Sequence, residues 1–168
     1  SIRTCALQSD AFIALKKVWE HRDTEAQKWR AQGKKVIGKL GFDVPDELRR
    51  CLVPKIILQP LIENAIHHGI LEKDSGTGTI SISSHRNGED VLITIADDGI
   101  GMNVEQLNNL KNGLGTGIGY ANTDRRIKLF FGSEYGLDIE SEEGKYTKIT
   151  IKIKERTEDS DNDCNNDC

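Results

Sequence analysis

The chain has 168 residues, 36% of them hydrophobic and 30% charged, with a formal net charge of −4. This size and apolar content suit one domain with a single core, and the sequence contains neither an apolar run long enough to cross a bilayer nor a secretory signal pattern. Lysine and arginine are scattered rather than gathered in a basic stripe, so nucleic-acid binding is not among the expected functions. Because the chain opens without an initiator methionine, we expect it to be a piece of a longer protein.

The first predicted element is a helix over residues 7–32, where apolar side chains recur at helical spacing. Its apolar stripe is narrow, which suits a helix that pairs with another helix, and Gly33 is placed to end it. A strand is expected at about 35–42, before a turn at 43–45. The stripe consists of Leu7, Ala11, Leu15, Val18, Ala26 and Trp29.

A second helix is predicted over residues 54–69. Pro54 fits its first turn and Gly69 is expected to end it. Pro60 would remove an interior hydrogen bond, so we expect the helix to start irregularly. The apolar stripe of this helix consists of Leu58, Leu61, Ile62, Ala65 and Ile66.

Beyond a glycine-rich loop at 74–79, alternating isoleucine and valine residues predict strands around 80–82, 91–95 and 149–153. The Asn-Gly pair at 87–88 is a hairpin turn signal between the first two of these strands. The alternation indicates a sheet with one buried face.

A further strand is expected at 136–141, after a helix at about 120–131 that ends at Gly132. The order of all these elements predicts an α+β fold, a two-layer sandwich with helices on one face of a mixed, mostly antiparallel sheet. The acidic tail, 155–168, has no apolar anchor and is expected to be disordered. The four cysteines lack zinc-ligand spacing, so we expect reduced thiols and no zinc site.

The first group of candidate functional residues lies on the second helix. Glu63, Asn64 and His67 fall opposite its apolar stripe. The amide oxygen of Asn64 can ligate Mg²⁺, which prefers oxygen, and the carboxylate of Glu63 can orient or deprotonate a nucleophile. A solvated polar face is the plainer interpretation of this helix taken alone.

The second and third groups are glycine-rich. Asp97, Gly99 and Gly101 directly follow a strand, where glycines let the backbone approach a flat ligand and a carboxylate can accept a hydrogen bond from an amine. The glycines of 113–119 lead into a helix whose N-terminus favours phosphate. Alone, the first group is also typical of a turn, and the second of a flexible linker. Neither a P-loop nor a dinucleotide-binding fold is supported.

Together and in this order, the three groups resemble the motifs of the GHKL ATPase superfamily. The sequences of these motifs are similar to those of sensor histidine kinases of the LytS/YehU type. "LQPLIENAIHHGI" (58–70) resembles their N box, and "GTGIGYANTDRRIKLFFG" (115–132) resembles their G2 box. The resemblance covers about residues 30–154 and implies the Bergerat type of α/β sandwich. It also implies Mg²⁺ and ATP as ligands.

Carried over by motif, the resemblance implies that Asn64 ligates Mg²⁺ and that Glu63 is the catalytic polar residue. Asp97 would bind the adenine amine, with Gly99 and Gly101 beneath the base. Residues from about 103 to 116 would form a mobile lid over the phosphates. The other implied nucleotide-binding residues are His67, which stands where the family has lysine, His68, Met102, Gly115, Thr116, Gly117, Ile118, Gly119, Asn122 and Thr147.

The implied function is that of a protein histidine kinase catalytic domain, spanning 33–154, which follows the end of a dimerisation helix pair at 1–32. No stretch like the family's phosphoacceptor motif is present, and His21 is a weak substitute because Arg22 follows it. The acceptor histidine is therefore expected outside this chain. The implied partners are that histidine-bearing helix pair and a response regulator. The implied setting is the cytoplasmic part of a membrane-anchored homodimer.

Two alternatives remain open. The fold could persist as a non-catalytic scaffold that docks a partner, since His67 occupies the lysine position. A protein serine kinase of the anti-sigma type belongs to the same superfamily, but the wording of both boxes argues against it.

Overall fold

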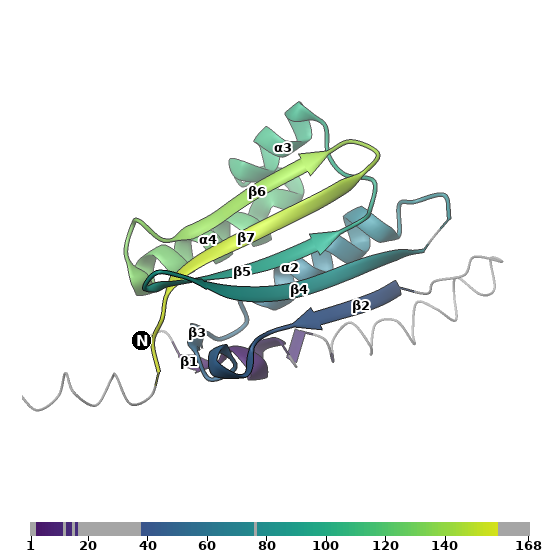
Figure 1. The fold of residues 1–168 in the computed structure, drawn as a ribbon. Helices are drawn as coiled ribbons and strands as arrows, with labels where there is room; N and C mark the ends of the chain where they lie inside the picture. The colour runs from purple at the N-terminus through teal and green to yellow at the C-terminus, as the bar shows by residue number, and fades with distance from the viewer. Residues whose placement is uncertain (1–2, 12, 15, 17–37, 76, 158–168) are drawn as a thin grey trace, which may run out of the picture.

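The computed structural model describes residues 3–11, 13–14, 16, 38–75 and 77–157. Five strands form one sheet in the order β2-β4-β5-β7-β6 (Figure 1). β2 pairs with β4 in parallel, and every other neighbouring pair is antiparallel. The predicted mixed, mostly antiparallel sheet is therefore confirmed. The strands are β2 (Gly38–Asp43), β4 (Gly78–Asn87), β5 (Asp90–Asp97), β6 (Gly136–Glu142) and β7 (Tyr146–Lys154).

The alternation seen in the sequence sets which face of the sheet is buried. Along β5 every second residue from Val91 is buried, and Ile93 and Ile95 face Ile151 and Ile149 of β7. Because side chains alternate across a strand, these branched residues form one apolar face against the helices. The predicted hairpin joins β4 to β5, with Gly88 at φ +66°.

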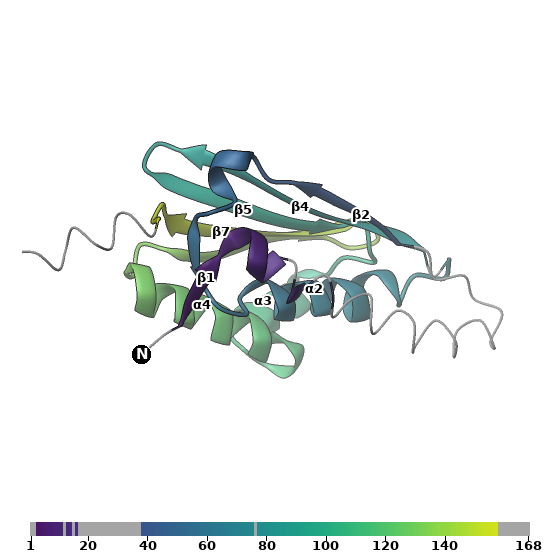
Figure 2. The ribbon, with the colours of Figure 1, turned by 90° about the horizontal axis from the view of Figure 1, so that it is seen from below.

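The helical layer lies on one face of the sheet (Figure 2). α4 ends at Gly132, as predicted, and its buried residues include Ile127 and Phe131. α3 begins with a capping box in which Asn103 and Gln106 each bond the other's backbone N–H. The helices are α2 (Leu58–Asn64), its π-helical continuation η2 (Ala65–Ile70), α3 (Val104–Lys111), the short η3 (Gly115–Gly117) and α4 (Ile118–Phe131).

The predicted start of the second helix is wrong by four residues. Pro54 does not open a helix but ends the short strand β3 (Leu52–Pro54), which pairs with β1 (Thr4–Ala6) in a separate two-stranded sheet. The helix begins at Leu58, which places Pro60 in the first turn. An N–H at that position has no partner within a helix, so the proline costs no hydrogen bond.

The described start of the first helix packs into the domain itself. Residues 7–11, 13–14 and 16 are helical, and Leu7, Ala11 and Ala14 are fully buried in the main core. This part of the helix therefore covers the domain's own core, and pairing with another helix stays a prediction. The rest of the predicted helix, with His21, lies outside the described residues. A short 3-10 helix, η1 (Asp46–Leu48), leads from β2 toward β3.

The described chain runs past β7. Arg86 forms a two-pronged ion pair with Glu155, at 2.6 and 2.7 Å, and the carbonyl of Arg156 accepts a hydrogen bond from the N–H of Leu52 at 2.8 Å. Glu155 and Arg156 therefore contact the domain, and the tail from 158 lies outside the described residues. No helix in the described ranges combines the length and apolar character needed to cross a membrane.

Candidate functional site

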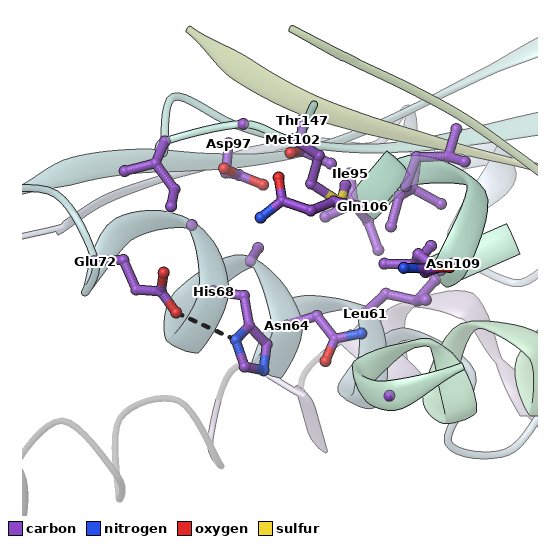
Figure 3. Close-up of a pocket in the computed structure, with 18 of the residues that line it drawn as sticks. Leu61, Asn64, His68, Glu72, Ile95, Asp97, Met102, Gln106, Asn109 and Thr147 are labelled. Carbon is purple, nitrogen blue, oxygen red and sulfur yellow. Dashed lines mark hydrogen bonds and ion pairs between the residues drawn. The ribbon is translucent and has the colours of Figure 1, made fainter. Parts of the chain in front are cut away.

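A cavity of about 330 Å³ lies between the helical layer and the sheet. Its walls come from α2 and η2 on one side, from β5, β6 and β7 on another, and from α3 with the loop that follows it (Figure 3). An apolar wall with a few polar groups is typical of a small-molecule site. The apolar lining consists of Leu61, Ala65, Ile95, Ile100, Met102, Leu110, Leu114, Ile139 and Ile149.

Asp97 lies at the end of β5 on the sheet side of the cavity (Figure 3). Asp97 is 5% exposed, and one of its carboxylate oxygens accepts a hydrogen bond from the N–H of Gly99 at 2.9 Å. Burial raises the pKa of this carboxyl to about 6, against the lowering effect of the Gly99 bond. The second oxygen remains available as an acceptor, as binding an exocyclic amine requires.

The turn after β5 packs tightly on η2. The N–H of Ile100 donates to the carbonyl of Gly69 at 3.2 Å, and a Cβ on Gly99 would lie 2.4 Å from the Cα of Gly69. Gly99 must be glycine for this backbone approach, whereas a Cβ on Gly69 would lie 2.6 Å from a carboxylate oxygen of Asp97. Gly69 lies in the π-helix η2, whose turn is wider than that of an α-helix. The N–H of Leu71 donates to the carbonyl of Ile66 at 2.9 Å in this turn.

Gly101 is required because of its backbone conformation and the close carbonyl of Glu142. Its φ is +63°, and a Cβ there would lie 2.0 Å from the carbonyl oxygen of Glu142. We expect Gly101→Ala to lower the free energy of unfolding by about 3 kcal/mol or more, measured by urea denaturation. Gly88→Ala is the matched control, because Gly88 has φ +66° with open space around it. It should cost about 1 kcal/mol. Equal losses would show that the clash at Gly101 is relieved.

Asn64 is the last residue of α2 and faces the cavity from the helical side (Figure 3). Its Nδ2 is buried and has no hydrogen-bond partner among the described residues. Gly119, in the first turn of α4, lies beside it, since an added Cβ would stand 3.9 Å from Nδ2. α4 has no side-chain cap, and the short η3 leads directly into it. A buried amide donor beside an uncapped helix N-terminus fits an anion such as phosphate.

The structure brings together seven of the residues singled out from the sequence. Asn64, His68, Asp97, Gly101, Met102, Gly115 and Thr147 line the cavity. The other described residues of that set do not line it. Glu63 accepts a hydrogen bond from Gln59 Nε2 at 2.8 Å instead. The remaining described residues of the set outside the lining are His67, Gly99, Gly117, Ile118, Gly119 and Asn122.

Three polar residues of the lining were missed by sequence reasoning. Glu72 holds Nδ1 of His68 at 3.4 Å, one turn along from it (Figure 3). Gln106 and Asn109 reach the cavity from α3, inside the segment expected to form a lid. The Asn-x-x-Gln spacing at 103–106 is typical of a capped helix, but it does not indicate which face of that helix would meet the cavity. The mobility of the lid stays a prediction.

A two-layer sandwich with its cavity between the helices and an antiparallel sheet defines a domain of the GHKL ATPase class. The chain belongs to the histidine kinase-, DNA gyrase B- and HSP90-like ATPase family, whose sequence profile matches residues 53–157. Sensor histidine kinases are among its relatives.

Two of these relatives are bacterial sensor kinases. The chain is 42% identical over 120 residues to the sensor histidine kinase YesM of Bacillus subtilis (strain 168), covering 71% of this chain and 20% of that protein. It is 30% identical over 147 residues to the sensor histidine kinase BtsS of Escherichia coli (strain K12), covering 88% and 25%. The chain thus spans a quarter or less of these two proteins.

Solved structures show the same fold. The catalytic domain of histidine kinase ThkA, in a nucleotide-free form, matches with a TM-score of 0.64 at 17% identity, covering 92% of this chain and 98% of that one. The Acinetobacter baumannii histidine kinase AdeS matches with a TM-score of 0.63 at 18% identity, covering 94% and 68%.

Proposed function

We propose that this chain is the ATP-binding catalytic domain of a two-component sensor histidine kinase. The observation that carries the proposal is the buried Nδ2 of Asn64, which has no hydrogen-bond partner among the described residues. It lies beside the start of α4, with the Asp97 acceptor on the sheet side of the same cavity. The first two features suit a phosphate chain, and the third suits an adenine amine. The apolar lining between them suits the base.

Each group has a defined task in this proposal. The free carboxylate oxygen of Asp97 accepts the amine of adenine, and Met102 with Ile95 packs against the ring. Asn64 Nδ2 and the first N–H groups of α4 donate to phosphate oxygens. Gln106 and Asn109 close the cavity from α3 and exclude water.

The site also fits Mg²⁺, provided that the nucleotide supplies most of the ligands. Among the described residues no three His, Cys, Asp or Glu side chains are grouped to hold a metal ion. Mg²⁺ commonly takes one or two protein oxygens together with phosphates and water, and the Oδ1 of Asn64 is the oxygen available here. When bound, the ion would offset the negative charge of the phosphates.

Three of the expected site residues, Glu63, His67 and His68, differ in how they lie relative to the cavity. Glu63, expected to be catalytic, accepts its hydrogen bond from Gln59 outside the cavity, so acting on a nucleophile would require its side chain to turn. His68 lines the cavity but is half exposed. His67 does not line it, so the phosphate contact expected at this position falls to His68 and the α4 N-terminus.

The phosphoryl acceptor and the partners are proposed from the relatives. The γ-phosphoryl group would pass to a histidine on the dimerisation helices of the complete kinase, and from there to a response regulator. The chain supplies positioning and donors for the phosphates, which is most of what phosphoryl transfer asks of a protein. The complete protein would be a membrane-anchored homodimer with this domain in the cytoplasm.

Binding and labelling with ATP test the proposal together. Titration with Mg·ATP should give saturable, one-site binding, while incubation with γ-labelled ATP should leave the chain unlabelled because the acceptor is elsewhere. Absence of saturation at millimolar nucleotide would favour the scaffold alternative. Strong labelling that is lost in His21→Ala would contradict the placement of the acceptor outside this chain.

A further inference from the structure

The site helix α2 is capped by a carboxylate from a distant part of the chain. Asp10, 1% exposed, accepts hydrogen bonds from the N–H groups of Ile57 at 3.1 Å and Leu58 at 3.0 Å, and from that of Ile56. The thiol of Cys5 is its fourth neighbour, at 3.8 Å. α2 has no side-chain cap of its own. Asp10 therefore provides the N-terminal cap of a helix that starts 48 positions later.

The peptide segment that Asp10 holds is strained. Ile56 has φ +62°, and among the described residues it is the one non-glycine residue with a positive φ. A β-branched residue adopts this conformation only when its surroundings impose it. The carbonyl of Lys55 accepts from Arg126 Nη2 at 2.6 Å, and that of Ile56 accepts from Arg126 Nη1 at 3.3 Å. Asp10 therefore binds the N–H side of this segment and Arg126 binds the carbonyl side.

Asp10 and Arg126, which bind this segment, connect it to helices that carry the proposed nucleotide site. Arg126 belongs to α4, whose first turn stands beside Asn64. α2 has seven α-helical residues, Asn64 is the last of them, and η2 continues the helix. If the first turn opens, Asn64 loses its support on the N-terminal side and is held from the η2 side alone. The position of Asn64 thus depends on the cap provided by Asp10.

We propose that Asp10 is a positioning residue for Asn64, and that through it the helix beginning at residue 7 controls how well the domain binds the phosphates of its nucleotide. The phosphate contact rests on the proposed function, whereas the contacts of Asp10 stand independently of it. Signals that reach the first helix of this chain would act on phosphate binding by this route.

The informative substitution is Asp10→Asn, which keeps the shape and removes one acceptor. The amide would point an N–H₂ group at one or more of the three backbone donors, so the first turn of α2 opens more often. Apparent affinity falls in proportion to the competent fraction. We expect about fivefold to tenfold weaker binding of Mg·ATP. Binding of adenosine, which lacks phosphates and meets only the Asp97 end, should be unchanged.

Two further variants separate positioning from a general loss of stability. Ile56→Gly in the Asp10→Asn background should recover part of the Mg·ATP affinity, because glycine adopts φ +62° without strain. Asp46→Asn is the matched control, since Asp46 is exposed and its one ion pair within the described part of the chain is with Arg49, one turn along. It should bind both ligands as the unmodified chain does. Hydrogen exchange should show faster exchange at the amides of residues 57–59 and 61–64 in Asp10→Asn alone.

Isothermal titration below the unfolding transition of every variant decides the matter. Equal losses for Mg·ATP and adenosine, with no recovery by Ile56→Gly, would overturn the positioning role and leave Asp10 as a structural residue. Unchanged Mg·ATP binding in Asp10→Asn would overturn it too, with the proposed function intact. If the unmodified chain binds no nucleotide, the proposed function fails and the positioning role falls with it.

Discussion

Asp97→Asn is expected to weaken Mg·ATP binding about a hundredfold, a loss of about 2.7 kcal/mol. One side-chain oxygen is already engaged by the N–H of Gly99, and asparagine would keep that bond. Its N–H₂ group would then face the cavity, where an adenine amine needs an acceptor. A buried pair of opposed donors is costly because neither group can turn to water. Isothermal titration with ATP and with adenosine should show the same proportional loss, since both carry the amine.

The same substitution should stabilise the nucleotide-free protein at neutral pH. Burial raises the pKa of Asp97 from 3.8 to about 6. Between about pH 4 and pH 6 the carboxyl is therefore protonated in the folded state and ionised in the unfolded state. Stability contributed by this group therefore falls as pH rises through that window, by about 3 kcal/mol in total. Asparagine does not titrate and escapes this loss.

Urea denaturation at pH 4.5 and pH 7 measures the effect. The difference in unfolding free energy between the two pH values should shrink in Asp97→Asn, whereas Asp74→Asn, in an exposed loop position, should leave it unchanged. An Asp97→Asn protein that binds ATP normally would show that the carboxylate is not the adenine acceptor. One that loses stability at pH 7 would contradict the burial argument.

Asn64→Ala is expected to weaken Mg·ATP binding by at least about a hundredfold while leaving the fold intact. Asn64 Nδ2 has no partner in the described structure, so its removal deletes a buried, unsatisfied donor rather than a bond. Alanine also suits a helix. The loss of affinity should shrink when Mg²⁺ is chelated, because the amide oxygen then has no ion to ligate.

Asn108→Ala supplies the comparison, because Asn108 is an exposed residue of α3 that does not line the cavity. It should bind Mg·ATP as the unmodified chain does, and its thermal unfolding should match that of Asn64→Ala within a few degrees. Normal affinity in Asn64→Ala would remove the residue from the site. Loss of affinity together with loss of folded structure would contradict the view that its amide is unpaired.

The sequence by itself determined the parts of this protein that depend on local spacing. Period-two alternation predicted the strands around 91–95 and 149–153, and the Asn-Gly pair at 87–88 predicted the hairpin. The stop at Gly132 was readable because a glycine after a helical pattern ends it through its own backbone freedom. The order of the glycine-rich motifs predicted the superfamily, and the family match over residues 53–157 confirms it.

Only the tertiary structure decided what depends on contacts between distant segments. Pro54 looked like a helix start but pairs with Thr4 in a strand, and α2 takes its cap from Asp10, 48 positions away. Glu63 turns to Gln59 within its own helix. Gln106 reaches the cavity because α3 packs against α4 and η3. The spacing of apolar residues along the chain shows which face of a helix or strand is buried, but not which distant segment that face contacts. The packing of the whole domain decides the contact.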